Sequence, residues 1–251
     1  MIAVFAAMEI EVQACLTSMS NTRRTELQGF PVYEAEGAVI CQTGIGARAQ
    51  EASEAALARY EPAVAVSVGV AGGLSPKLGA GDLVVCERVD HESHRHSGVD
   101  ATVMSHPGLI EAAVAAARGM DLSVSAGSSI TVDELAAGAD EKSAHHAWKG
   151  HDIVEMESFW IGEAAAKRGL PFLAVRAISD GAAEPLVMIG AIKPDGNFDQ
   201  QALLGYVHEH PEVARHVARQ YEAGRLALSN LTVFLAAFLA PLVQHFHSGV
   251  R

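Results

Sequence analysis

The side chains that could do chemistry lie in short runs that follow apolar stretches of the chain. Glu11 comes after the first apolar run, and Glu155 and Glu157 stand two residues apart after another. Carboxylates in such positions are candidates for acid–base catalysis. Arg176 lies inside a further apolar run, where an unpaired charge is costly, so we expect it to have an acidic partner. Asp180 ends that run, in the position where a substrate would be met.

Two glycine-rich turns accompany these acids. The first, Gly44-Ile45-Gly46-Ala47-Arg48, matches a dinucleotide-binding fingerprint only in part, because the third glycine is missing. Its backbone N–H groups could still hold an anion or a water molecule. The second, Gly69-Val70-Ala71-Gly72-Gly73, consists of small residues that let a flat ligand lie close to the backbone.

The elements that must position these residues alternate along the chain. Apolar runs without polar–apolar alternation predict strands of a sheet that is buried on both faces, and Ala-rich stretches between them predict helices. We therefore predict a single-domain α/β sandwich over residues 1–251, with ligands bound beyond the carboxyl ends of the strands. The predicted strands are 2–7, 39–42, 63–68, 83–89, 122–126, 152–154 and 172–178, and the predicted helices are 9–19, 47–60, 107–118, 133–148 and 157–168.

The composition excludes several classes of protein. The 251 residues are 49% hydrophobic and 19% charged, which excludes intrinsic disorder. The net charge of −12 and the lack of any Lys/Arg-rich run argue against nucleic-acid binding. The three cysteines are far apart and form no disulfide or zinc pattern, and no basic segment precedes the first apolar run, so we expect no signal peptide and a cytoplasmic setting.

Five segments between Met8 and Asp180, taken together, carry a resemblance to a known family. In chain order they are AAMEIEV, TGIG, GVAGGL with GDLVV, VEMES and VRAISD. The combination resembles the purine nucleoside phosphorylase/nucleosidase superfamily, and within it the 5′-methylthioadenosine/S-adenosylhomocysteine nucleosidases. The resemblance implies a three-layer sandwich with a mixed, twisted central sheet, a homodimer, and no metal or other cofactor.

The resemblance also implies a role for individual residues. Asp180 matches the aspartate that protonates or hydrogen-bonds purine N7, and Ser179 helps to place the base. Glu157 matches the glutamate that binds the ribose hydroxyls, and Met156 packs against the sugar. Glu11 matches the carboxylate that activates water. The remaining residues of the predicted substrate site are Met8, Val70, Ala71, Gly72, Glu155 and Arg176, the last supporting the acidic loop.

These roles fit the chemistry of N-glycosidic bond cleavage. A purine leaves poorly as an anion, so a proton delivered to N7 helps by typically ~10²–10⁴-fold. Asp180 would therefore hold a proton in an apolar pocket. Glu157 would face the positive charge that grows on the sugar, and ionised Glu11 would deprotonate water on the opposite side of the sugar.

The chain departs from the nucleosidase pattern at two positions. Ile10 interrupts a run of acids, and Val70 stands where the pattern has a serine. Arg48, next to the TGIG turn, could serve a phosphate together with Gly44 and Gly46. Water and inorganic phosphate therefore both remain open as the acceptor of the sugar.

The segment after Asp180 is also longer than a nucleosidase needs. With VEMESFWIG and TVDEL, this extension of about 70 residues (181–251) is similar to the hopanoid-associated phosphorylases, which act on adenosylhopane. Residues 186–192 and the C-terminal helix could form a slot for a lipid-like 5′ substituent. The apolar run 231–243 is too short to span a membrane and contains Pro241, so it predicts a buried or oligomer-facing helix, with peripheral membrane contact left open.

The leading prediction is thus cleavage of the N-glycosidic bond of an adenine nucleoside that carries a hydrophobic 5′ group. Phosphate is a possible co-substrate, and phosphorolysis of adenosylhopane is the specific form of this prediction. The alternatives are a hydrolytic 5′-methylthioadenosine/S-adenosylhomocysteine nucleosidase and a purine-binding protein without turnover. A nicotinamide oxidoreductase does not fit the incomplete glycine spacing. His91, His94 and His96 form a dense loop, which we interpret as a border of the pocket rather than as a metal site.

Overall fold

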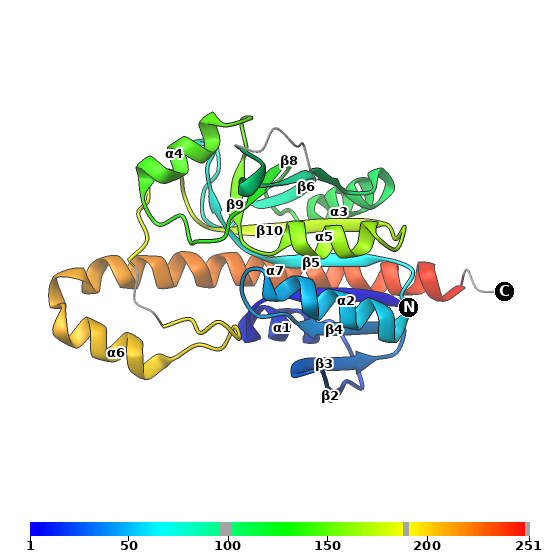
Figure 1. Cartoon of the computed structure of the whole chain (residues 1–251). Helices are drawn as coiled ribbons and strands as arrows, with labels where there is room; N and C mark the ends of the chain where they lie inside the picture. The colour runs from blue at the N-terminus through cyan, green and yellow to red at the C-terminus, as the bar shows by residue number, and fades with distance from the viewer. Residues whose placement is uncertain (96–101, 188–190, 249–251) are drawn as a thin grey trace.

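The computed structural model describes residues 1–95, 102–187 and 191–248. A mixed sheet forms the middle of three layers: helices α1, α3 and α7 cover one face, and α2 and α5 cover the other (Figure 1). This confirms the predicted α/β sandwich. The helices are α1 (Glu9–Leu16), α2 (Arg48–Tyr60), α3 (Pro107–Gly119), α4 (Ala139–Ala147), α5 (Ser158–Ala166), α6 (Gln200–Glu209) and α7 (Ala214–Ser248), with short 3-10 turns at Glu92–Arg95 and Pro211–Val213.

The sheet has the strand order β10-β6-β8-β9-β5-β1-β4-β3-β2, and β7 pairs with β6. Since β10 also pairs with β5, the five strands β5, β10, β6, β8 and β9 form a closed ring. The strands are β1 (Ile2–Ala6), β2 (Arg23–Leu27), β3 (Phe30–Ala35), β4 (Ala38–Gln42), β5 (Ala65–Gly73), β6 (Leu83–His91), β7 (Thr102–Met104), β8 (Val124–Thr131), β9 (Ile153–Glu155) and β10 (Phe172–Asp180).

The pairing of β5 with β10 positions the candidate site. The two strands are parallel, with Gly69 opposite Arg176 and Gly72 opposite Asp180. β1 runs parallel to β5 on its other side, so α1, which follows β1, begins at the same edge of the sheet. The carboxyl ends of β1, β5 and β10 therefore meet at one edge, and β9, which is antiparallel to β5 and pairs with Gly72 and Gly73, brings Glu155 to the same region.

Helix α7 runs along β10 and β5 on one face of the sheet (Figure 1). It is long and apolar enough to cross a membrane by length and composition, but its apolar side chains at helical spacing are part of the core. These buried side chains are Ala227, Leu231, Phe234, Leu235, Phe238, Leu239 and Leu242. The prediction of a buried helix over 231–243 is confirmed, although the helix is much longer than that run and contains Pro241.

Several elements differ from the sequence prediction. β2 and β3 form a hairpin that was not predicted, because their exposed and half-exposed side chains include five charged or tyrosyl groups. Its turn places Gln28 (φ 52°) and Gly29 (φ 85°) in the left-handed region, the geometry of a type I′ turn. β8 extends to Thr131 instead of ending at 126, and the helix predicted from 133 begins only at Ala139.

The segment after β10 folds back over the beginning of the chain. Glu9 N–H donates to Gly196 O at 3.2 Å, and Ile45 N–H donates to Pro194 O at 2.9 Å. Gly196 has φ +83°, and a Cβ there would lie 2.0 Å from Ala7 O, so only glycine allows this approach. α6 and the first half of α7 then extend beyond the sheet (Figure 1).

Candidate active site

Glu11 is buried at the start of α1 and accepts three backbone hydrogen bonds. Its Oε2 accepts the N–H groups of Ala7 (3.0 Å) and Met8 (2.9 Å), and its Oε1 accepts that of Val70 (2.8 Å). A Cβ on Gly69 would lie 2.5 Å from Oε1, so glycine is needed where the carboxylate meets β5. Burial raises the pKa of Glu11, and the hydrogen bonds oppose this rise. The result is a fixed carboxylate that is more basic than an exposed one.

Arg176 pairs with Glu155, as the sequence predicted that it would with an acid. Arg176 is 2% exposed, and its Nη2 donates to Glu155 Oε2 and to Ser67 Oγ, each at 2.9 Å. Thr131 Oγ1 donates to the other oxygen, Glu155 Oε1. Burial opposes ionisation of Glu155, but Arg176, Thr131 and two N–H donors together hold its pKa below the usual value. Glu155 is therefore an ionised structural acid.

Glu157 caps this cluster. Its backbone N–H donates to Glu155 Oε2 at 3.0 Å, and its own Oε1 accepts the N–H of Gly46 at 3.0 Å. Burial, followed by the nearby charge of Glu155, raises the pKa of Glu157 to about 8. Arg176 and Glu11 also act on this pKa, in opposite directions, so all four groups share one electrostatic neighbourhood. Met156 between the two acids is half-buried and packs against a small core cluster.

Asp180 lies at the other end of the site. It is 4% exposed, and Ser179 Oγ donates to its Oδ1 at 2.6 Å. Its Oδ2 forms an ion pair with Lys142, whose side chain from α4 is fully buried. Sequence reasoning missed Lys142, because a lysine in a predicted amphipathic helix carries no signal of burial. This contact differs from the predicted apolar pocket around Asp180, because the neighbour is a lysine.

β5 spans the distance between the two ends of the site. Gly69 contacts Glu11, and Gly72 lies where a Cβ would be 3.1 Å from Asp180 Oδ2. Three residues along a strand cover roughly 10 Å. Val70 is half-buried and Ala71 is buried between them, and the predicted contact of a flat ligand with this backbone stays a prediction. One strip of the β5 backbone thus has Glu11, with Glu157 in the same cluster, at one end and Asp180 at the other.

The TGIG turn does not leave its backbone donors open. The N–H groups of Gly44, Ile45 and Gly46 donate to Ala7 O (3.1 Å), Pro194 O (2.9 Å) and Glu157 Oε1 (3.0 Å). Arg48 is exposed, with its guanidinium over the Phe30 ring at 5.4 Å. The donors that the predicted phosphate site requires therefore already have acceptors within the chain.

The loop histidines show no metal cluster among the described residues. His91 is buried, and its Nε2 lies 3.3 Å from Asp133 Oδ1. The side chain of His94, and all of His96, lie outside the described residues, as do residues 188–190 of the predicted apolar slot. In the ranges that the structure covers, no three His, Cys, Asp or Glu side chains gather as metal ligands would.

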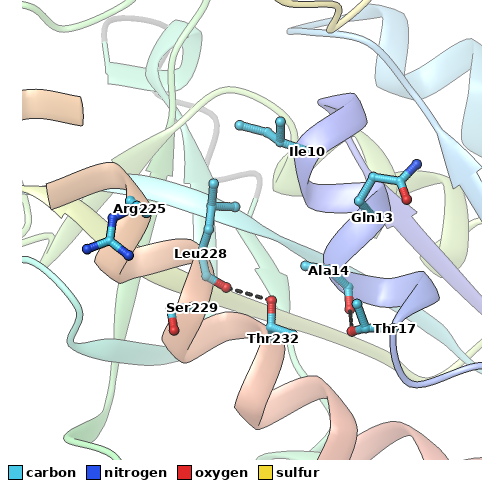
Figure 2. A pocket seen from close by; sticks show the side chains of 8 residues that line it. All are labelled: Ile10, Gln13, Ala14, Thr17, Arg225, Leu228, Ser229 and Thr232. Carbon is cyan, nitrogen blue, oxygen red and sulfur yellow. Dashed lines mark hydrogen bonds between the residues drawn. The ribbon is translucent and has the colours of Figure 1, made fainter. Parts of the chain in front are cut away.

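Two surface cavities lie away from these acids. One, of about 330 Å³, is lined by side chains of α1 and α7, which pack together beside it, and Ile10 points into it (Figure 2). The other, of about 730 Å³, lies beside β7 and α3 and is lined in part by Arg88, Met104 and Asp152. The first explains the departure at Ile10, because this side chain faces α7 and not the strip of β5 beside Glu11.

Comparison with known proteins identifies the family. The family model described as "Phosphorylase superfamily" matches residues 1–233. The chain belongs to this superfamily. A 5′-methylthioadenosine/S-adenosylhomocysteine nucleosidase of Bacillus pumilus is 29% identical over 86% of this chain and 97% of its own length. A protein of the same name from Geobacillus kaustophilus is 31% identical over 72% of this chain and 85% of its own length.

A solved structure has the same fold. The nucleosidase of that name from Neisseria meningitidis, in complex with methylthio-immucillin-A, superposes with a TM-score of 0.74 at 22% identity and covers 95% of this chain and 97% of its own. The superfamily member described here is an enzyme of the nucleoside phosphorylase and nucleosidase type, and its reaction is the cleavage of a purine nucleoside's N-glycosidic bond.

Proposed function

We propose that this enzyme is a hydrolytic nucleosidase that releases adenine from a 5′-substituted adenosine, with 5′-methylthioadenosine and S-adenosylhomocysteine as the substrate class. The relatives named above support this choice through the activity in their names. The observation that carries it is the environment of Glu11. This buried carboxylate is fixed by three N–H donors beside the backbone strip on which a nucleoside would lie.

The hydrogen bonds of Glu11 leave room for one water molecule. An ionised carboxylate has about four acceptor sites. Within the described part of the chain, Oε2 accepts two N–H groups and Oε1 accepts one, which leaves one site on Oε1 for the proton of an attacking water. The raised pKa of Glu11 makes it a better base near neutral pH. The arrangement therefore supports water as the acceptor of the sugar.

The remaining acids divide the work between sugar and base. We assign Glu157 to the ribose hydroxyls, as the resemblance implies, and its burial beside Gly46 supports a fixed orientation for this side chain. We assign Asp180 and Ser179 to the purine, and their mutual hydrogen bond supports a shared role. The occupied N–H groups of the TGIG turn speak against phosphate as the acceptor. The predicted phosphorolysis of adenosylhopane thus gains no support, and hydrolysis is the proposal.

A second candidate concerns the 5′ group. Ile192 and Phe198 are 47% and 48% exposed on the segment that folds back over Ala7 and Gly44. Exposed apolar side chains beside the predicted pocket favour a lipophilic 5′ substituent over a charged one. A 5′-alkyl adenosine with a higher kcat/KM than S-adenosylhomocysteine would support this candidate, and the reverse order would count against it. The homodimer and the absence of a cofactor stay predictions.

The matched substitutions Glu11→Gln and Glu9→Gln test the role of the base. Both residues lie in the first turn of α1, but Glu9 is exposed whereas Glu11 is buried. We expect Glu11→Gln to lower kcat by roughly 10²–10⁴-fold, the usual contribution of a general base. Glu9→Gln should stay near the wild-type rate. Equal rates in the two variants would show that Glu11 is not the base.

A further inference from the structure

Lys142 is the most unusual side chain of the site. Lysine is almost never fully buried unless it is paired, yet the side chain of Lys142 has no exposed surface. Its Nζ contacts Asp180 Oδ2, Gly181 O (3.0 Å) and Glu184 O (2.8 Å). An ammonium group has three N–H donors. Three acceptors surround Nζ, so the geometry is that of a charged, fully hydrogen-bonded lysine.

The carboxylate of Asp180 has one oxygen for each neighbour. Oδ1 accepts the hydroxyl of Ser179 at 2.6 Å, and Oδ2 faces Lys142. Oδ2 also borders the backbone strip of β5, because a Cβ on Gly72 would lie 3.1 Å from it and 3.7 Å from Lys142 Cε. One oxygen therefore touches the ammonium and also lies beside the surface on which a purine would rest.

This pairing changes where the proton for the base must come from. A carboxyl group that contacts an ammonium is stabilised in its ionised form. Among the described side chains, Ser179 and Lys142 are the two that contact the Asp180 carboxylate and carry a proton. A serine hydroxyl is too weak an acid for this task, which leaves the ammonium.

We propose that Lys142 stores the proton that ends on the purine and delivers it through Asp180. The proposal rests on the proposed function. In the transfer, the Nζ–H bond breaks and an Oδ2–H bond forms, which leaves a neutral amine and a carboxylic acid. As the glycosidic C–N bond breaks, the Oδ2–H bond breaks and an N7–H bond forms. Asp180 is then a carboxylate again, and solvent returns a proton to Lys142 after the products leave.

Burial lowers the cost of the first transfer without reversing the resting ion pair. Moving a proton from a cation to an adjacent anion leaves two neutral groups, and a low-dielectric site penalises two neutral groups less than two charges. In the resting site, the two carbonyl oxygens of Gly181 and Glu184 hold the ammonium in place. When negative charge grows on the departing purine, it draws the proton towards N7. Lys142 is thus a positioning residue that acts through Asp180.

Two substitutions separate proton supply from simple ion pairing. Lys142→Met removes both the charge and the proton. Lys142→Arg keeps the charge beside Asp180, but arginine does not release a proton in proteins. The matched control is Lys167→Met, because Lys167 is half-exposed and pairs with Glu163 on the surface. Thermal unfolding of each variant shows whether the fold is retained.

The assay compares two leaving groups on the same enzyme. One substrate is 5′-methylthioadenosine, and the other is a 4-nitrophenyl riboside, whose leaving group departs as a stable anion without a proton. We expect Lys142→Met and Lys142→Arg each to lower kcat for adenine release by at least about 100-fold, with nitrophenolate release reduced by less than about 5-fold. KM should change little, since Lys142 does not touch the substrate. Lys167→Met should match the wild type on both substrates.

Three results would overturn the proposal. An equal loss on both substrates would make Lys142 a purely structural residue. Near-wild-type adenine release by Lys142→Arg would show that charge alone suffices. If neither variant folds, the wild type decides: adenine release must be slower in D₂O in a single turnover, and the lack of such an effect removes the proton transfer. By contrast, a wild type that releases no adenine at all would refute the proposed function itself.

Discussion

The substitution Arg176→Met probes the buried ion pair beneath the site. Arg176 and Glu155 have side-chain exposures of 2% and 1%, with Nη2 and Oε2 2.9 Å apart. Methionine fills much of the same volume but leaves Glu155 as a buried charge without its cation. Removing one partner of a buried pair costs about 3–5 kcal/mol. The remaining donors to Glu155, which are Thr131 Oγ1 and two backbone N–H groups, do not replace a full positive charge.

This loss of unfolding free energy predicts a fall in the melting temperature, Tm. An unfolding entropy of about 2.1 cal/mol/K per residue over 251 residues is about 0.5 kcal/mol/K, so Tm should fall by roughly 6–10 °C at pH 8. The pKa of Glu155 lies below its usual value in the folded wild type, so the stability it contributes is present above that value and is lost as the pH falls. The difference in Tm between variant and wild type should therefore narrow towards pH 4.

The control for this prediction is an ion pair of the same type on the surface. Arg225 contacts Glu222 at 3.0 Å, but the two side chains are 68% and 62% exposed. Arg225→Met should cost less than about 1 kcal/mol, as exposed pairs do. Differential scanning calorimetry of the two variants gives both values. A fall in Tm of under about 2 °C for Arg176→Met at pH 8 would refute the reasoning, because the buried charge would then have found another partner.

Further predictions concern Glu157, Gly196 and Asp180. The folded pKa of Glu157 is about 8 against an ordinary 4.5, so its protonated form stabilises the fold at low pH, and this contribution is lost as the pH rises from 4.5 through 8. Glu157→Gln should therefore flatten the plot of unfolding free energy against pH between these values. An unchanged slope would contradict this prediction. Gly196→Ala should lower Tm and raise KM, because the new Cβ would lie 2.0 Å from Ala7 O. The control is Gly224→Ala, whose Cβ would have no atom within 4 Å. Calorimetry should show that this control stabilises the fold by up to about 1 kcal/mol. Asp180→Asn should abolish adenine release while nucleoside binding, measured by calorimetric titration, is largely kept; wild-type turnover in this variant would remove Asp180 from the proton path.

The buried strands and the site acids could be predicted from the sequence for a physical reason. An apolar strand that is covered on both faces has a continuous run of apolar residues. An acid that ends such a run must lie where the strand ends and leaves the sheet. The buried Arg176 required an acidic partner for the same reason, and Glu155 is that partner. Both inferences use only residues that are near one another in the sequence, and both are confirmed for the central strands.

The features that could not be predicted depend on contacts between distant parts of the chain. In the sequence, Lys142 is an ordinary helical lysine. Its partner Asp180 lies 38 residues further along the chain, at the end of β10, and only the fold brings the two together. The occupation of the TGIG turn depends on Pro194, which lies about 150 residues further along the chain. The β2–β3 hairpin lies at the edge of the sheet, where polar side chains are tolerated and leave no apolar pattern.

The proposed hydrolysis requires water as the acceptor of the sugar. The direct measurement is adenine release from 5′-methylthioadenosine with and without inorganic phosphate, with identification of the sugar product. We expect the same rate in both conditions and a free 5-methylthioribose as the product. Release that requires phosphate and yields a sugar 1-phosphate would contradict the role of Glu11 as the base and would make the enzyme a phosphorylase.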